Sequence, residues 1–216
     1  MKVRRAIIKD LKRVQDLYGI VSDEMAGTIY DIMWRRDIYP SKKEIVKDIR
    51  HHELYVLVKD NKIIGAMVLN HEYDECYNKL SWQIFADDDE VLILHRLCIH
   101  PQYRGCGKFL IKQAIEIAKF LNQKAIRLDV LCTNKPAIYL YEKYGFLLQG
   151  YQTMDYGEPV VAGLYESSDV FEYLNLITAL LLTIVPLGTD LIIKVLPPIT
   201  EPSPTTVSPP NTLALE

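Results

Sequence analysis

The sequence predicts an α/β (α+β) fold, in which a mixed central β-sheet is flanked by helices on both faces. Three observations support this class. Strand-like apolar runs and segments of helical periodicity follow one another in the order β-α-α-β-β-β-α-β-α-β. Two neighbouring strand-like runs are separated by a short polar turn, which indicates a hairpin. A chain of 216 residues can also bury a sizeable core, and we expect one domain with an appendage.

The N-terminal quarter is predicted to hold one strand and two helices. Residues 2–8 form the strand, after which Asp10 can cap a helix. The apolar positions of this first helix fall on one face, namely Leu11, Val14, Leu17, Tyr18 and Val21. Pro40 and Ser41 open the second helix, whose apolar residues form a buried side while its lysines and glutamates face water.

The hairpin is predicted over residues 53–70, with β-rich runs on either side of Asp60 and Asn61. Residues 71–90 then combine aromatic and polar side chains and end in the acidic run 87–90. This segment has two interpretations. It is either a solvated loop before a strand, or a source of negative charge that draws a cationic amine to a nearby site.

The stretch from 92 to 111 is the one around which the chain is organised. It begins as an apolar strand, breaks at a histidine-proline step, passes through a basic loop with Gly105 and Gly107, and enters a helix predicted at 108–121. Amides at a helix start are unpaired and carry partial positive charge, and glycines let a phosphate approach the backbone closely. The order therefore suggests an anion site.

Two familiar phosphate motifs fail on spacing. A P-loop requires serine or threonine after its lysine, and Phe109 follows Lys108. A dinucleotide fingerprint requires a third glycine at position 110, which is leucine.

Further along, a strand is predicted at 125–131, then a helix with Pro136 in its first turn that stops at Gly145, then a strand from Phe146.

Composition excludes several classes of function. The formal net charge of −3 gives no reason to expect nucleic acid. The four cysteines lie far apart and form no zinc-ligand spacing with each other or with histidine, so neither a metal site nor a disulfide framework is expected. The N-terminus carries charges where a signal peptide needs an apolar core, which predicts a cytoplasmic location.

From Leu92 to Gly150 the sequence resembles the GCN5-related N-acetyltransferase (GNAT) superfamily, which uses acetyl-CoA. Two motifs carry the resemblance, and the upstream elements follow the family's order over roughly residues 2–155. The motifs are Gln102-x-x-Gly105-x-Gly107 and Asn134-x-x-Ala137-x-x-x-Tyr141-x-x-x-Gly145-Phe146. The resemblance implies a sheet whose strands splay apart at a cofactor cleft.

The resemblance also implies a set of cofactor-binding residues. The strand before the loop would offer backbone hydrogen bonds to the pantetheine arm, and the loop amides would hold the pyrophosphate. Asn134 would contact the cofactor from the far side, and Tyr141 would lie near its sulfur. The strand and loop residues concerned are Leu97, Cys98, Ile99, Gln102, Arg104, Gly105, Cys106, Gly107 and Lys108.

The loop departs from the family pattern. Similar members usually carry Pro-x-Tyr-Arg/Gln-Gly-x-Gly-x-Gly, whereas this chain has Pro101-Gln102-Tyr103-Arg104-Gly105-Cys106-Gly107-Lys108, about two residues shorter. Either Gln102 starts the motif in a tightened turn, or the cradle has lost an amide and binds more weakly.

Acetyl transfer to an amine needs a base for the amine and an acid for the departing thiolate. Tyr141 suits the acid role because its ordinary pKa lies above that of a thiol, although it could instead be an aromatic packing residue. A strand glutamate used as base by histone-acetylating members is replaced by Ile93. His95 lies on the same face and titrates near neutrality, although such histidines are more often structural. Glu72, Glu90 and a water relay are further candidates.

The chain is predicted to divide into a catalytic domain and a tail. Residues 1–170 form the N-acetyltransferase domain, 171–197 an apolar extension, and 198–216 a proline-rich disordered tail. A last strand could come from residues 169–174. The apolar run is interrupted after about twelve residues, too few to span a bilayer, so we favour a packed extension or a homodimer contact over a membrane anchor.

The predicted function is transfer of acetyl from acetyl-CoA to a primary amine of a small molecule or protein. The acidic run favours a cationic acceptor without selecting one, and aminoglycosides, polyamines, amino acids and protein amines are all candidates. The alternative is a catalytically impaired protein of the same shape that binds CoA or a protein partner, which the shortened loop and the missing strand glutamate would support.

Overall fold

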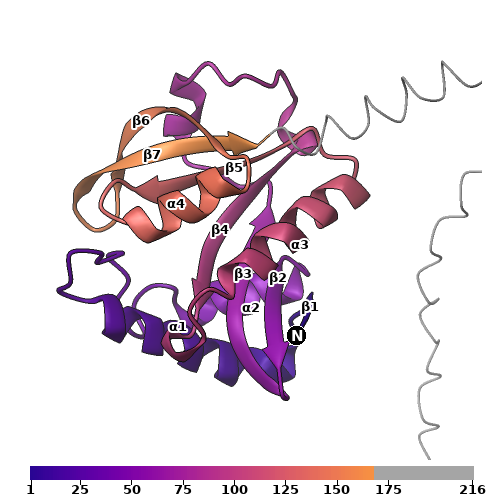
Figure 1. Cartoon of the computed structure of the whole chain (residues 1–216), viewed down its shortest axis with the longest axis vertical. Coiled ribbons are helices and arrows are strands. Elements are labelled where there is room, and N and C mark those ends of the chain that lie inside the picture. Colours follow the sequence, from indigo (N-terminus) through magenta and orange to yellow (C-terminus); the bar gives the residue numbers. More distant parts are fainter. Residues whose placement is uncertain (168–216) are drawn as a thin grey trace, which may run out of the picture. The chain divides into compact units, whose positions relative to one another are not determined.

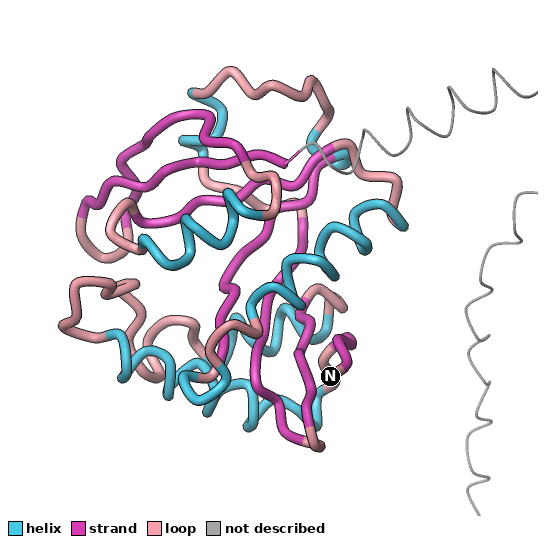
Figure 2. Tube along the Cα trace, in the orientation of Figure 1, coloured by secondary structure: helices cyan, strands magenta, loops and turns pink. Residues whose placement is uncertain are grey.

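The computed structural model describes residues 1–167, and their strands form a single mixed sheet (Figures 1 and 2). The sheet has seven strands in the described residues, in the order β1-β2-β3-β4-β5-β7-β6, and every neighbouring pair is antiparallel except β4 and β5. The strands are β1 Lys2–Arg5, β2 Leu54–Lys59, β3 Lys62–Asn70, β4 Val91–Ile99, β5 Ala125–Leu131, β6 Leu147–Asp155 and β7 Pro159–Ser167. The predicted mixed sheet is confirmed.

Helices cover both faces of this sheet, as predicted. They are α1 Leu11–Met25, α2 Lys42–Arg50, α3 Gly107–Phe120 and α4 Lys135–Lys143. Helices α1 and α2 pack on one face of β2, β3 and β4, whereas α3 and α4 pack on the opposite face, where Leu110, Ile111 and Ala114 are fully buried. Short 3-10 turns occur at Ile8–Asp10, Glu75–Lys79, Asp88–Glu90 and Pro101–Tyr103.

Asp10 begins α1, but its carboxylate does not cap that helix. The first strand ends at Arg5 rather than at residue 8. The Asp10 side chain is completely buried and accepts hydrogen bonds from Arg4 (2.6 and 3.0 Å), Arg13 (2.6 Å) and the Ile7 N–H (3.0 Å). The Arg4 guanidinium chiefly lowers the pKa of this carboxyl. Asp10 therefore anchors the strand to the helix, because arginine side chains compete successfully for its oxygens.

The other local signals of the N-terminal half behave as predicted. Ser41 caps α2 and accepts from the Glu44 N–H at 3.3 Å, while the Glu44 carboxylate accepts from the Ser41 N–H at 2.7 Å. In the β2–β3 hairpin, Asp60 and Asn61 have φ values of 49° and 59°. Positive φ at both central residues is the geometry that a tight hairpin turn requires.

The C-terminal half contains a strand that was not predicted. β7 lies between β5 and β6 and pairs with both of them. Residues 71–90 also differ from a fully solvated loop, since Cys76 and Tyr77 are buried against the sheet. The predicted strand at 169–174, the apolar extension and the proline-rich tail lie outside the described residues.

Candidate active site

The candidate site lies where β4 and β5 separate. These two strands pair over three residues only, Val91–Ile93 with Ala125–Arg127, and then diverge (Figure 1). Beyond that point β4 pairs with β3 alone and β5 with β7 alone among the described strands. Each strand therefore presents an edge with unpaired backbone groups toward the other, which is rare inside a sheet because buried N–H and C=O groups need partners.

The backbone of Leu97 and Ile99 faces the open edge of β4. His100 donates its N–H to the Ile64 carbonyl of β3 at 2.8 Å. Backbone groups alternate along a strand, so Cys98 also faces β3, and the residues between them face away from it. The structure thus brings Leu97 and Ile99 to the edge where a pantetheine arm would bind, and it turns Cys98 away from that edge.

A bulge in β4 changes which side chains face which side of the sheet. Ala66 pairs with Cys98 and Val68 with His95, so β4 uses three steps where β3 uses two. Arg96, the extra residue, has a φ of 49°, which a residue other than glycine adopts rarely. The bulge therefore shifts the alternation of side chains by one residue. Leu94 before it and Leu97 after it both face α3 and α4, whereas His95 faces the side of the sheet covered by α1 and α2.

The basic glycine loop ends at the first turn of α3. Gly105 has a φ of 81°, and a side chain there would meet nothing within 4 Å, so glycine is required by the backbone and not by crowding. A Cβ at Gly107 would lie 2.8 Å from Leu140 Cδ2, so this glycine lets α3 approach α4. The amides of Gly107 and Lys108 lie in the first helical turn, where amides have no intrahelical acceptor.

Two loop residues use their amides within the loop. Cys106 donates its N–H to Tyr103 O at 3.2 Å, and Gln102 donates its N–H to His100 Nδ1 at 3.3 Å. Arg104 is 85% exposed at its side chain, with Glu24 at 3.8 Å, so its guanidinium can turn toward a bound anion. The loop therefore offers fewer free amides than its length suggests.

Tyr141 projects from α4 toward the gap between the two strands. Its ring is buried and lies 5.7 Å from the Phe146 ring. Burial raises the pKa of its hydroxyl, and Asp129 on β5 and Cys98 on β4 are both close enough to raise it further. In the described residues this hydroxyl has no hydrogen-bond partner, yet it is not among the polar atoms sealed from solvent. It is therefore free to donate a proton.

Asn134 has a structural role in addition to any binding role. It begins α4, and its side-chain oxygen accepts the Ala137 N–H at 3.3 Å. Its own N–H donates to Leu131 O at 2.9 Å, so it joins the end of β5 to the helix. The side-chain NH₂ group has no acceptor within residues 1–167 and can still reach a ligand.

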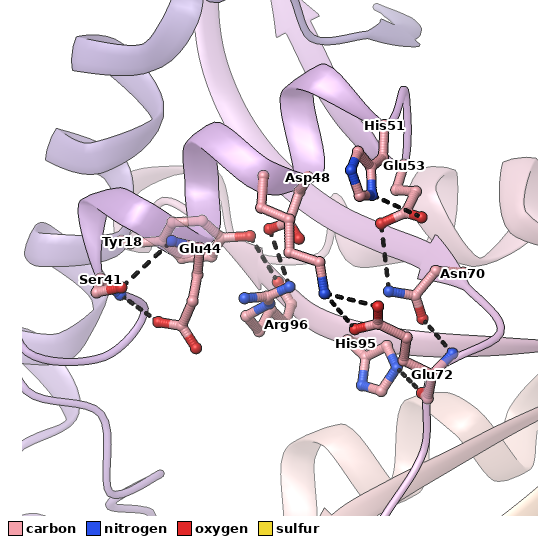
Figure 3. Close-up of polar contacts among 11 residues, drawn as sticks. Tyr18, Ser41, Glu44, Asp48, His51, Glu53, Asn70, Glu72, His95 and Arg96 are labelled. Carbon is pink, nitrogen blue, oxygen red and sulfur yellow. Dashed lines mark hydrogen bonds and ion pairs between the residues drawn. The ribbon is translucent and has the colours of Figure 1, made fainter.

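His95 is held in the orientation and charge state that a base requires. Its Nε2 lies 2.8 Å from the Glu72 carbonyl oxygen, which can only accept, so Nε2 carries the proton and Nδ1 keeps its lone pair (Figure 3). Burial chiefly lowers the pKa of His95 below its ordinary 6.5, and the Arg96 charge lowers it further. His95 is therefore neutral near pH 7, which a proton acceptor needs.

The two glutamates considered as alternative bases are both engaged by lysines. Lys47 Nζ lies 2.6 and 2.7 Å from the Glu72 carboxylate oxygens, and Lys124 Nζ lies 2.5 Å from Glu90. These lysine contacts are the main reason why the pKa of each carboxyl is lowered. Both are poor proton acceptors in this state.

Asp129 is a candidate site residue that was not predicted from the sequence. It lies on β5 opposite Leu164 and faces the same side of the sheet as His95. The Tyr77 hydroxyl donates to Asp129 Oδ1 at 2.8 Å, and the Tyr156 hydroxyl makes a short hydrogen bond to Oδ2. Burial, followed by the Asp129 charge, raises the pKa of both tyrosines. The signal in the sequence was the polar alternation of Arg127 and Asp129 between apolar residues, which normally marks a solvent-facing side.

The segment 71–90 is fastened to the sheet by a buried ion pair. Arg127 Nε lies 3.0 Å from Glu166 Oε1, and their side chains are 11% and 2% exposed. Arg127 also donates to Ile84 O and Glu166 accepts from Ile84 N, both at 3.0 Å, while the guanidinium stacks 4.3 Å from the Trp82 ring. This clamp supports the loop that supplies the Glu72 carbonyl to His95.

The fold and these groups together define a class of protein. A parallel strand pair that opens onto free amides, with a tyrosine hydroxyl on one side and a neutral histidine on the other, is suited to acyl transfer. Residues 22–146 match the Acetyltransferase (GNAT) family, and the chain belongs to that family. It is an acetyl-CoA-dependent N-acetyltransferase with acetyl-CoA as its co-substrate, as predicted.

Three similar proteins illustrate the relationship. A Bacillus subtilis (strain 168) protein named as a putative ribosomal protein bS18-alanine N-acetyltransferase is 25% identical over 143 residues, which cover 65% of this chain and 80% of that one. An acetyltransferase of the GNAT family from Streptococcus agalactiae 2603 has a TM-score of 0.67 at 22% identity, covering 78% and 95%. PaiA N-acetyltransferase from Thermoplasma acidophilum, solved with coenzyme A, has a TM-score of 0.55 at 22% identity, covering 77% and 98%.

Two further features are absent from the described residues. No helix within residues 1–167 has the length and apolar character needed to cross a bilayer. In the same range, no three His, Cys, Asp or Glu side chains are grouped so that they could hold a metal ion.

Proposed function

We propose that the chain binds acetyl-CoA between the diverging edges of β4 and β5 and acetylates a primary amine on the side of the sheet that carries His95 and Asp129. The observation that carries this proposal is the loss of β4–β5 pairing after Ile93. It leaves the backbone of Leu97 and Ile99 unpaired with β5, so β4 has an open strand edge inside the sheet, in addition to the sheet's two outer edges. An extended pantetheine arm can occupy such an edge with hydrogen bonds of the kind a strand makes.

The residues around this edge fit acetyl-CoA. The first-turn amides of α3 and the positive φ at Gly105 suit a pyrophosphate, and Arg104 adds a mobile positive charge. The Asn134 NH₂ group is free to contact the cofactor from the opposite strand. The complete proposed set is Leu97, Cys98, Ile99, Gln102, Arg104, Gly105, Cys106, Gly107, Lys108, Asn134 and Tyr141. Within it, the amides of Cys98, Gln102 and Cys106 are already engaged and contribute least.

When bound, acetyl-CoA supplies an acetyl group activated as a thioester. His95 Nδ1 accepts the proton of the attacking amine, whose ordinary pKa is roughly 10 if it is lysine-like. The open-edge amides stabilise negative charge that develops on the carbonyl oxygen. The Tyr141 hydroxyl then donates its proton to the leaving sulfur, which it approaches from the face opposite to His95. For an amine that has already lost its ammonium proton, one proton is thus taken from the attacking nitrogen and one is given to the thiolate sulfur, which leaves as the thiol of CoA.

The acceptor is proposed to be a cationic primary amine of a small molecule or a protein. Asp129 has its carboxylate on the acceptor side, where it accepts a hydrogen bond from Tyr77 of segment 71–90. The acidic run 87–90 at the end of that segment adds exposed negative charge. A hollow of about 330 Å³ lies between residues 28–33 and the adjoining parts of β5 and β7, and its mixed apolar and polar lining includes Asp31. The name of the Bacillus relative points to a protein N-terminus as one acceptor to test.

The test is a steady-state assay of thiol release over a panel of acceptors, namely polyamines, amino acids and peptides with a free N-terminus. We expect turnover with at least one cationic amine and heat of binding with acetyl-CoA alone. The absence of binding heat at millimolar acetyl-CoA would overturn the cofactor site. Binding without turnover on any amine would favour the alternative of a CoA-binding protein that lacks catalysis.

The remaining predictions are retained as proposals. They are a catalytic domain that ends near residue 170, a cytoplasmic location and a homodimer. Truncation after residue 170 followed by the same assay checks the domain boundary, because an intact domain would keep its activity.

A further inference from the structure

Helix α2 holds the irregular part of β4 through two consecutive residues (Figure 3). Asp48 Oδ2 lies 2.9 Å from Arg96 Nη2, and the two side chains are 4% and 10% exposed. Lys47 holds the Glu72 side chain, and the Glu72 carbonyl orients His95. Helix α2 contributes no residue to the proposed site. One of its turns nevertheless contacts the bulge residue Arg96 directly and His95 indirectly, through Glu72.

The bulge itself is fixed from two directions. Arg96 has a φ of 49°, a backbone conformation that persists only where its surroundings enforce it. The Tyr18 hydroxyl of α1 donates to the Arg96 carbonyl at 3.3 Å, and Asp48 of α2 holds the guanidinium. Main chain and side chain of the same residue are thus bound by different helices.

The Arg96–Asp48 ion pair is buried with incomplete hydrogen bonding, so it is expected to contribute little to the stability of the fold. Within the described residues, Arg96 Nε and Asp48 Oδ2 are sealed from solvent without a well-directed hydrogen bond. Removing two charges from water carries a large penalty, and a buried pair with incomplete hydrogen bonding does not recover it. Apolar side chains of similar volume would pack there at least as well, so the pair is better explained by where it places the backbone.

We propose that Asp48 and Arg96 are positioning residues for acetyl transfer, which hold the β4 bulge in register. With the bulge in place, His95 faces the amine, while the Leu97 and Ile99 backbone faces the open edge. A slip of one residue would exchange these faces, since neighbouring residues in a strand point in opposite directions. This inference rests on the proposed function, because it assigns a role within the same site.

The experiment compares wild type with the double variant Asp48→Leu/Arg96→Met, which removes both charges together and leaves neither unpaired. We expect a folded protein whose kcat falls about 10²-fold, the size of loss that a displacement of about 1 Å can cause. The Kd of acetyl-CoA from calorimetry should rise by a smaller factor than kcat falls, because only the Leu97 and Ile99 backbone follows the bulge, whereas the first-turn amides of α3 lie beyond it and keep their position. A merely structural pair would lower the Tm and leave kcat unchanged.

Two further variants keep the test decisive. Tyr18→Phe removes only the bond to the Arg96 carbonyl and should lower kcat by less than the 10²-fold expected of the double variant. If the double variant fails to fold, Tyr18→Phe alone decides, and an unchanged kcat in it overturns the positioning role. Arg4→Met is the matched control, because it removes a partner of the buried Asp10 far from the bulge. It should lower the Tm without changing kcat.

The outcomes distinguish the positioning role from the proposed function. If wild type turns over and both the double variant and Tyr18→Phe keep its kcat, the positioning role is overturned while the proposed function stands. If wild type and Arg4→Met both fail to acetylate any amine, the proposed function fails first, and the positioning role fails with it.

Discussion

The two strand edges that face each other across the candidate site are built differently. On β4 the useful groups are main-chain amides and His95, and they are directed by a bulge with Arg96 at positive φ, by a buried hydroxyl of α1 and by a buried carboxylate of α2. On β5 the strand is regular through Asp129, and the useful groups are side chains joined by hydrogen bonds to tyrosine hydroxyls. Tyr141 stands between the two edges, on the face of α4.

This difference separates the two tasks of the enzyme. A co-substrate that is always the same can be held by backbone groups, whose position matters more than their identity. A cationic acceptor amine, as proposed above, can be recognised by a charged side chain, and Asp129 lies on the acceptor side. Variation in the β5 side chains should therefore change the acceptor, whereas variation around the β4 bulge should change the rate.

The largest expected effect is at Tyr141, which belongs to neither edge. Tyr141→Phe removes the proposed proton donor without creating a cavity, so kcat should fall about 10² to 10⁴-fold. The Kd of acetyl-CoA from calorimetry should stay close to that of wild type. Tyr139→Phe on the same helix is the control, since Tyr139 is 66% exposed and should leave kcat unchanged. Equal losses in kcat and affinity would remove the acid assignment.

The next effect tests the chemistry assigned to β4. His95→Gln keeps a hydrogen-bonding side chain but cannot take a proton, so kcat/KM should fall about 10²-fold. The base acts when deprotonated and its pKa is lowered, so wild-type activity should rise with pH below 6.5 and level off above it. The variant should lack this rise. A pH profile unchanged by the substitution would assign the base to another group or to water.

The same histidine links pH to stability. Its pKa in the folded protein is lower than in the unfolded chain, so below pH 6.5 the unfolded state binds more protons and stability is lost as the pH falls. In His95→Gln this contribution is absent. Chemical denaturation at pH 5 and pH 7 should therefore show a smaller stability difference in the variant than in wild type.

A smaller effect tests acceptor recognition by β5. Asp129→Asn removes the negative charge and keeps one of the two oxygens that accept from Tyr77 and Tyr156, so KM for a cationic amine should rise by about tenfold, or about 1.4 kcal/mol. KM for acetyl-CoA should not change. Steady-state kinetics at low and high salt checks the charge, because the difference between the two proteins should shrink at high salt. A rise in KM for acetyl-CoA instead would place Asp129 with the cofactor.

An effect of similar size concerns the loop. Gly105→Ala forces a Cβ into a left-handed backbone, at roughly 1 to 2 kcal/mol, and should weaken acetyl-CoA binding by a comparable amount. Gly27→Ala is the control, because Gly27 also has positive φ and a Cβ there would meet nothing within 4 Å, but it lies outside the loop. Both variants should lose similar stability in denaturation, and only the first should lose affinity in calorimetry.

Features that depend on local chemistry could be predicted from the sequence. The hairpin at Asp60 and Asn61, the Ser41 cap and the glycine after α4 each follow from one or two residues with a known backbone preference. Strand β7 could not be predicted in this way. It begins with Pro159 and contains Gly163, both of which weaken a strand pattern, and Gly163 is needed because a Cβ there would meet Tyr165 and Leu148.

The parts of the site that were missed depend on tertiary context. Arg96 has no sequence signal for positive φ, since arginine rarely adopts it, and its contacts with Tyr18 of α1 and Asp48 of α2 form only in the folded chain. Asp129 belongs to a polar alternation that resembles a wet surface, and it becomes internal because segment 71–90 folds over it. Tyr141 and His95 were predicted as candidates, and their catalytic roles stay predictions.

The three-residue junction between β4 and β5 has a thermodynamic consequence. Beyond this junction the facing edges of β4 and β5 are not paired with each other. In the proposed binding mode, acetyl-CoA would complete these backbone hydrogen bonds and so act as a temporary strand that joins the two halves of the sheet. By mass action, acetyl-CoA at about a hundred times its Kd should add about 2.7 kcal/mol to the free energy of unfolding. Binding of acetyl-CoA to the protein could then be measured as a rise in Tm, even before an acceptor is known.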